Sequence, residues 1–468
     1  MNKYEELMNR KQEILLKSLG TDYSKYEIDT LAFNYEKMMR DINYSLNEIK
    51  EIQKEVGVSD TPMLELKNIT ALARKVSKNG CAARIMLKDE SCNPSGSFKD
   101  RRAALAVYDA MKKGYKGVAS ATSGNYGAAV ASQAAMRGLK CIIVQEAFDS
   151  RMIGQPEILE KARKCEGFGA EVIRLTLGPE LFYAYLKILE ETGYYNASLY
   201  SVYGIAGVET LGYEIAEQCR EKFQKDPVAV VVTHAGGGNV TGTARGLIKA
   251  GALDTEVIGA SVDLSGLHMA SDKDFNRKSF TTGHTGFGVP FIVNPDRSDV
   301  PRSAARPLRY MDRYVTVPQG EVFYMTELLA QIEGLERGPA GNTSLAAAFV
   351  LSQQYGNDDI IVVQETEYTG AGKHILPQLS FAKKNGIKIE IGDPKDEIPG
   401  KNIILPNEPC KLFVKEMDMS SLKESYIKNL LPQILDKELS EEDIDFLCME
   451  TKWDKKHVLN ALKKLTHK

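Results

Sequence analysis

The sequence has few cysteines, and none of the seven stands in a CxxC pair or beside a histidine cluster. Scattered thiols exclude a disulfide framework and a zinc site of common spacing, and they indicate a reducing compartment. No run of about 18 apolar residues is present, so no membrane span is predicted. The amino terminus is charged from Lys3 and has no apolar signal core, which predicts a cytoplasmic protein.

An excess of charge of either sign is also missing. The formal net charge is −3, which predicts no attraction to nucleic acid or to an anionic membrane. Hydrophobic residues make up 43% and charged residues 26%, as in ordinary globular proteins. The 468 residues exceed a single core of about 250–300 residues, so more than one domain is expected.

Composition divides the chain into three parts. Residues 1–60 are rich in Lys and Glu and predict a helical N-terminal extension of two or three helices. Residues 61–393 alternate β-rich runs with amphipathic stretches and predict the catalytic core, with a smaller subdomain near 105–220. Residues 394–468 begin with a Pro-rich linker and continue as a small helical module.

One strand–turn–helix–strand unit is especially clear. Residues 116–121 predict a strand, 122–127 a turn, 128–137 an alanine-rich helix and 139–145 the next strand. Repetition of this alternation along the core predicts an α/β fold with mostly parallel sheets covered by helices.

Three polar segments of the core are candidates for chemistry. The first is SGSFKD (95–100), where small residues before Lys99 would let a planar cofactor approach the backbone. A lysine becomes a covalent catalyst when its amine is neutral beside a carbonyl group. By itself, the segment is weak evidence, because most lysines near glycine and serine are solvated loop residues.

The second segment, SATSGNYG (120–127), joins a strand to a helix. Amides at a helix start favour an anion, and the hydroxyls of Thr122 and Ser123 would suit a substrate carboxylate. Asn125 offers an amide to a phenolic oxygen of a cofactor ring. The structural alternative is helix capping by Thr122 or Ser123.

The third segment places Gly236, Gly237, Gly238 and Asn239 between a strand and a helix. Three glycines allow backbone amides to converge on a phosphate. The segment lacks the GK[ST] of a Walker loop and does not fit GxGxxG.

The three segments in this order resemble the fold type II, tryptophan-synthase-β-like pyridoxal-phosphate enzymes. Residues 207–218 and 333–348 extend the resemblance, which covers roughly 60–390. It implies two open, twisted, mostly parallel sheets flanked by helices, here with helical N- and C-terminal extensions. It also implies pyridoxal 5'-phosphate as the cofactor and no metal.

The resemblance also implies roles for matching residues. Lys99 matches the Schiff-base lysine and catalytic base, Asn125 the partner of the ring oxygen, Thr122 and Ser123 the substrate-carboxylate ligands, and Gly236 to Asn239 the phosphate cradle. The partner of the pyridine nitrogen is open: Thr366 and Thr369 are candidates, and Glu365 is an alternative.

The terminal extensions and the QETEYTGAG segment (364–372) resemble the family of larger, β subunits of 2-amino-4-oxopentanoate thiolases. This implies cleavage of that small amino acid with coenzyme A to alanine and acetyl-CoA in ornithine breakdown. It also implies a small partner subunit and self-association.

Further side chains are weaker candidates. Tyr126 and His284 are possible substrate contacts, with packing and a structural turn as the alternatives, and Cys92 lies close to Lys99 in the sequence. The five arginines in 296–313 suit coenzyme A phosphates, or else form a solvated basic segment or a subunit contact.

Other functions stay open at this point. Within the resembled superfamily, threonine-synthase-like replacement and diaminopropionate-lyase-like elimination are the alternatives. A nicotinamide-dependent oxidoreductase is disfavoured by the absence of GxGxxG. A non-catalytic binding subunit is disfavoured because Lys99 is intact.

Overall fold

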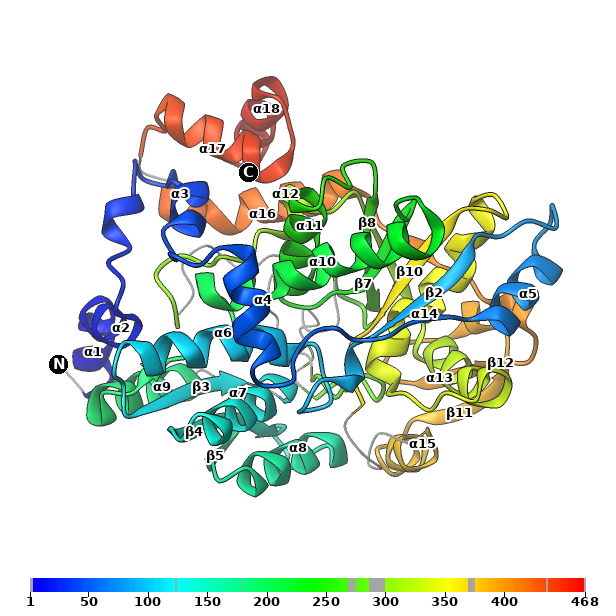
Figure 1. Ribbon diagram of the computed structural model, residues 1–468, viewed down its shortest axis with the longest axis horizontal. Coiled ribbons are helices and arrows are strands. Elements are labelled where there is room, and N and C mark those ends of the chain that lie inside the picture. The colour runs from blue at the N-terminus through cyan, green and yellow to red at the C-terminus, as the bar shows by residue number, and fades with distance from the viewer. Residues whose placement is uncertain are drawn as a thin grey trace.

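The computed structural model describes residues 3–122, 124–178, 180–267, 274, 276–285, 299–368, 375–434 and 437–466 (Figure 1). Ser123 and Thr369, named above, lie outside these residues, as does Arg297, one of the five arginines in 296–313.

The larger of two main sheets has seven strands in the order β1-β2-β10-β7-β8-β9-β13. Only the edge strands β1 and β13 run antiparallel to their neighbours. The strands are β1 (Met63–Glu65), β2 (Arg84–Asp89), β7 (Ala229–Thr233), β8 (Glu256–Val262), β9 (Arg313–Val317), β10 (Ile360–Glu365) and β13 (Lys415–Glu416).

Alternate residues of the central strands enter two separate apolar cores, because successive strand side chains point to opposite faces. Val230 and Val362 pack in the core shared with α10 (Val202–Phe223) and α11 (Gly238–Lys249). Val231 and Val363 pack in the core shared with three other helices. These are α5 (Lys67–Val76), α13 (Gln319–Leu328) and α14 (Pro339–Leu351).

The smaller sheet is wholly parallel, in the order β5-β4-β3-β6. Its strands are β3 (Gly117–Thr122), β4 (Lys140–Phe148), β5 (Glu171–Thr176) and β6 (Tyr195–Asn196). The helices beside it are α6 (Lys99–Lys112), α7 (Asn125–Met136), α8 (Pro156–Gly167) and α9 (Glu180–Thr192). Two mostly parallel sheets flanked by helices confirm the predicted fold class.

The described part of residues 1–60 forms four short α-helices instead of the two or three predicted. Gly20 ends α2 at a φ of +61°, and Asn34 and Ser45 cap two further helices, so the chain turns more often than its periodicity suggested. The helices are α1 (Lys3–Asn9), α2 (Lys11–Leu19), α3 (Tyr35–Arg40) and α4 (Leu46–Lys54).

The C-terminal residues pack against the N-terminal extension, and Figure 1 shows α17 near α3. The Asp443 carboxylate accepts hydrogen bonds from the amides of Leu31 and Ala32, both at 2.8 Å. The elements of this part are α15 (Ile375–Lys384), β11 (Lys388–Gly392), β12 (Asn402–Pro406), α16 (Met419–Ile434), α17 (Glu441–Thr451) and α18 (Lys455–Thr466). In the part of the chain that the structure describes, no helix is long and apolar enough to span a membrane.

The arginines of 296–313 that are described take part in the same packing. Arg302 pairs with Glu27. Arg306 directly precedes the short helix α12 (Pro307–Tyr310) and Arg309 lies within it, and both pair with Glu450. Arg313 pairs with Glu416. Their charges are matched within the chain, which favours a structural role over the coenzyme A site considered above.

A buried cluster of charges fixes the start of α6. The Arg101 guanidinium donates to both carboxylate oxygens of Glu90, at 2.7 and 2.8 Å, and to Glu214 at 2.9 Å. Lys88 also pairs with Glu214, and none of the four side chains is more than 6% exposed. Burial alone would raise the pKa of Glu214, but Arg101 and Lys88 hold it at about 2. The cluster therefore joins β2, α6 and α10 only while all partners are charged.

Replacing Arg101 with Met is expected to destabilise the protein by about 3–5 kcal/mol, since it leaves Glu90 and Glu214 buried with less compensation. The denaturant midpoint measures this loss. Arg174→Met, which removes a largely exposed ion pair with Glu166, is the control and should change stability by about 1 kcal/mol or less. Equal effects of the two substitutions would contradict the importance of the buried cluster.

Candidate active site

The loop before α6 holds Lys99 against the end of strand β10. Phe98 N donates to the carbonyl of Thr366 at 3.1 Å, and Tyr368 N donates to the carbonyl of Gly96 at 2.8 Å. Gly96 has a φ of +78°, and a Cβ there would lie 2.3 Å from the Tyr368 carbonyl oxygen, so only glycine fits. The backbone around Lys99 is therefore fixed on both sides.

Lys99 is the first residue of α6, and its amine is poised near neutrality. Burial, followed by the positive charges of Lys161 and Arg102, lowers the pKa of Lys99 to about 7. Near neutral pH, a large share of this amine is thus unprotonated. A neutral amine can attack a carbonyl group or accept a proton.

The predicted polar turn joins β3 to α7 in the smaller sheet. Thr122 ends β3, and its hydroxyl accepts a hydrogen bond from Gly124 N at 3.1 Å. Asn125 begins α7 and is 5% exposed, and its amide oxygen has no hydrogen-bond partner among the described residues. The buried hydroxyl of Tyr126 likewise finds no partner there. Buried polar atoms of this kind indicate a place for a polar ligand.

The glycine segment joins β7 to α11 in the larger sheet, and it is crowded on one side. A Cβ at Gly236 would lie 2.1 Å from the Tyr200 hydroxyl oxygen, and one at Gly238 would lie 2.1 Å from Nη2 of Arg102. Gly237 has a φ of +81°. The Asn239 side-chain nitrogen is buried and has no partner within the described residues. Open amides at the start of a 12-residue helix suit an anion.

Helix α8 brings a buried ion pair to the same region. Lys161 pairs with Glu157 one turn earlier, and both side chains are at most 5% exposed. A Cβ at Gly124 would lie 3.1 Å from Nζ of Lys161, while one at Gly283 would lie 2.9 Å from the Glu157 carboxylate. The pair therefore lies between the β3–α7 turn and the loop that carries His284.

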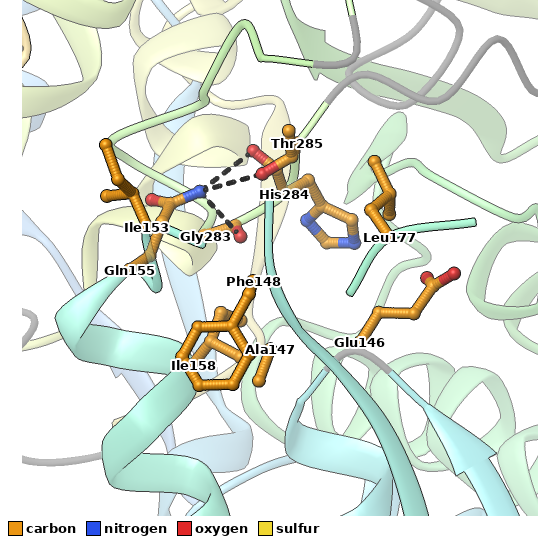
Figure 2. A pocket seen from close by; sticks show the side chains of 10 residues that line it. All are labelled: Glu146, Ala147, Phe148, Ile153, Gln155, Ile158, Leu177, Gly283, His284 and Thr285. Atoms are coloured by element: carbon orange, nitrogen blue, oxygen red, sulfur yellow. Dashed lines mark hydrogen bonds between the residues drawn. The ribbon is translucent and has the colours of Figure 1, made fainter. Parts of the chain in front are cut away.

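His284 lines a pocket between β4, the start of α8 and its own loop (Figure 2). Gln155 holds the loop: its side-chain nitrogen donates to the carbonyls of Gly283 at 2.9 Å and His284 at 3.1 Å. Burial and the charge of Lys161 lower the pKa of His284 to about 4. The imidazole is thus neutral at physiological pH.

Strand β10 ends in Glu365, and Thr366 follows directly. Both side chains are buried, at 0% and 4% exposure. The backbone contact between Thr366 and Phe98 places this strand end beside the Lys99 loop. The strands β2, β7 and β10 are parallel, so the polar segments that follow them meet at one edge, where α/β folds bind ligands.

Comparisons with known proteins agree with this geometry. A family model described as pyridoxal-phosphate dependent enzyme matches residues 54–367. The chain belongs to this family. Its cofactor is pyridoxal phosphate.

Two curated relatives are 2-amino-4-ketopentanoate thiolase beta subunits. One, from Acetoanaerobium sticklandii, is 64% identical over 462 residues, covering 99% of this chain and 98% of the relative. The other, from an unknown prokaryotic organism, is 63% identical with the same coverage.

Solved structures support the fold. A pyridoxal 5'-phosphate-dependent aspartate racemase aligns with a TM-score of 0.55 and 18% identity over 70% of this chain and 96% of its own. Serine racemase from Dictyostelium discoideum aligns with a TM-score of 0.54 and 22% identity over 70% of this chain and 99% of its own.

The residues present fit the cofactor of the family. The Lys99 amine, with a pKa of about 7, can react with an aldehyde, and the glycine turn, which has no room for side chains, can bring its amides to a phosphate. Polar atoms of Asn125 and Asn239 that have no partner among the described residues can bind further polar groups of the cofactor. The structure gathers Lys99, the β3–α7 turn, the glycine segment, Thr366 and His284 in one region, and their individual roles stay predictions. Ser123 and Thr369 lie outside the described residues.

Sequence analysis missed four polar side chains of this region: Arg102, Tyr200, Glu157 and Lys161. Arg102 could have been predicted from the sequence, because a residue three positions after Lys99 lies on the same face of a helix. The other three could not, since they come from separate elements and meet the site only through tertiary contacts.

We predict that Lys161→Met raises the pKa of Lys99, because one positive neighbour is lost and the freed Glu157 favours the ammonium form. Competitive labelling of Lys99 in cofactor-free protein should then need a higher pH to reach half of its maximum.

Lys140→Met removes an exposed lysine at the start of β4 and serves as the control, with no shift expected. An unchanged midpoint in Lys161→Met would show that Lys161 does not act on Lys99.

Proposed function

We propose that this chain is the catalytic β subunit of a 2-amino-4-oxopentanoate (2-amino-4-ketopentanoate) thiolase of ornithine breakdown. The main support for this proposal is the 63–64% identity of the chain, over 99% of its length, to two thiolase beta subunits. In the reaction, the bond between C3 and C4 breaks and the sulfur of coenzyme A bonds to C4. The thiol proton balances the hydrogen gained at C3, which yields alanine and acetyl-CoA.

The bound cofactor supplies an electron sink for a carbanion next to the substrate nitrogen. We assign Lys99 as its covalent anchor and as the base that removes the Cα proton, because a pKa of about 7 leaves much of its amine unprotonated near neutral pH. Gly236 to Asn239 hold the phosphate, and Asn125 contacts the ring oxygen. The buried side chains of Thr366 and Glu365 keep their place as candidates beside the pyridine nitrogen, together with Thr369.

The substrate carboxylate is assigned to the β3–α7 turn, where Thr122, Ser123 and the first amides of α7 offer donors. Tyr126 and His284 border the substrate. The neutral imidazole of His284 contributes a hydrogen bond at physiological pH and not a positive charge.

The assembly and the domain division are also part of the proposal. The relatives' beta-subunit names support a partner subunit. We expect this partner to be small and the chain to associate with itself in the cytoplasm. The catalytic core spans 61–393, with a smaller subdomain near 105–220 that contains the four-stranded sheet. The extensions 1–60 and 394–468 join it, and β11 pairs with β12 across the second boundary.

Lys99→Ala is expected to lower acetyl-CoA formation from 2-amino-4-oxopentanoate and coenzyme A by at least about 10²- to 10⁴-fold, the size of a lost acid–base group. The assay contains the small partner subunit. Borohydride reduction of the wild-type holoenzyme, followed by peptide mass mapping, should find the cofactor on Lys99.

Lys112→Ala, at the exposed end of the same helix, is the matched control and should retain activity. A wild-type protein that carries the cofactor but releases ammonia or needs a phosphorylated substrate would instead favour the lyase or threonine-synthase alternatives.

A further inference from the structure

Arg102 is a buried cation whose charge is not matched within the described chain. Its side chain lies in the first turn of α6 and the residue is 4% exposed. Nη1 donates to the carbonyl of Leu199 at 3.2 Å, and Nε finds no partner among the described residues. The guanidinium also lies 5.5 Å from the ring centroid of Phe98. Carbonyl and ring contacts leave the full positive charge in place.

The neighbouring Arg101 shows how this chain normally treats a buried guanidinium. Arg101 has two carboxylate partners, Glu90 and Glu214, which raise its pKa despite burial. Burial lowers the pKa of Arg102, and only the hydroxyl groups of Tyr126 and Tyr200 act in the opposite direction. Because burying an unmatched charge is costly, an anion from outside the chain is expected beside Arg102.

The position of Arg102 identifies the kind of anion. Nη2 lies 2.1 Å from where a Cβ of Gly238, the first residue of α11, would stand. The Tyr200 hydroxyl oxygen lies at the same distance from a Cβ of Gly236. The Asn239 side-chain nitrogen adds another buried donor. Helix-start amides, a guanidinium and neutral donors on one glycine turn suit a phosphate monoester dianion.

We propose that Arg102 is a charged ligand of the cofactor's phosphate and makes the site selective for the phosphorylated form of the cofactor. This inference rests on the part of the proposed function that places the phosphate at Gly236 to Asn239, and it is independent of the substrate. Helix α6 carries Lys99 and Arg102 three residues apart on one face, so a phosphate bound at Arg102 also sets the distance of the cofactor from the Lys99 amine.

The test measures cofactor affinity without any substrate. Wild-type protein is stripped of its cofactor and titrated with pyridoxal phosphate and with pyridoxal, which lacks the phosphate, following absorbance and intrinsic fluorescence. Arg102→Met should weaken pyridoxal phosphate binding by about 10- to 100-fold, as expected for loss of a hydrogen bond to a charged group. Because Arg102 also lowers the pKa of Lys99, the affinity for pyridoxal should fall too, but by a clearly smaller factor than the affinity for pyridoxal phosphate. Arg102→Lys should recover part of the lost pyridoxal phosphate affinity.

Arg137→Met is the matched control. Arg137 is also a largely buried arginine with a backbone acceptor, Ile52, and an unpartnered Nε among the described residues. It differs in having an ion pair with the exposed Glu55, at 3.7 Å, and in following the far end of α7. It should bind both cofactor forms like the wild type. Inorganic phosphate should raise the melting temperature of cofactor-free wild type and of Arg137→Met more than that of Arg102→Met.

Equal losses for pyridoxal phosphate and pyridoxal in Arg102→Met would overturn the proposal, because they would indicate a structural role. Undiminished pyridoxal phosphate affinity would overturn it as well. If Arg102→Met does not fold, the ratio of the two affinities in Arg102→Lys decides, and an unchanged ratio would count against the proposal. Failure to form acetyl-CoA would reject the thiolase assignment and leave this result untouched.

Discussion

The buried charge cluster around Arg101 is the constraint on which the active region depends. Arg101, Lys88, Glu90 and Glu214 match one another inside the protein, and they join β2, α6 and α10 at the base of the helix that begins with Lys99. Ion pairs at this depth hold their geometry strictly, because any displaced partner becomes an uncompensated charge. The position of Lys99 is therefore set by the ion pairs of the neighbouring Arg101 and by the backbone hydrogen bonds between the Lys99 loop and the end of β10.

Around Lys99 the charges are not fully matched, because Arg102 has no carboxylate partner among the described residues. Lys161 and Arg102 both act on Lys99, and with burial they bring its amine to the pKa at which it is useful as a nucleophile and a base. An anionic cofactor and an anionic substrate would match that charge. Arg102 thus contributes both to cofactor binding and to the reactivity of the Lys99 amine, whereas Lys161, which is paired with Glu157, acts on the amine alone.

The main features of the fold, and the positions of three polar segments of the candidate site within it, were predictable from the sequence. Alternating apolar strands and amphipathic helices predicted the parallel sheets, and the polar segments at 95–100, 122–126 and 236–239 fall where strands give way to helices. The arginines of 296–313 showed the limit of this reasoning. Composition made them candidates for a phosphate ligand, yet those described pair with carboxylates from distant parts of the chain.

By itself, the sequence determined the order of strands and helices, the lysine at a helix start and the glycine turn, because these follow from local periodicity and backbone freedom. Only the tertiary structure decided that Lys161 on α8 lies against Gly124, that Tyr200 covers Gly236, and that Arg102 faces the glycine turn without a carboxylate partner among the described residues. Such contacts join residues many positions apart. They depend on how the two sheets pack, which sets the distances between charges and thereby their pKa values.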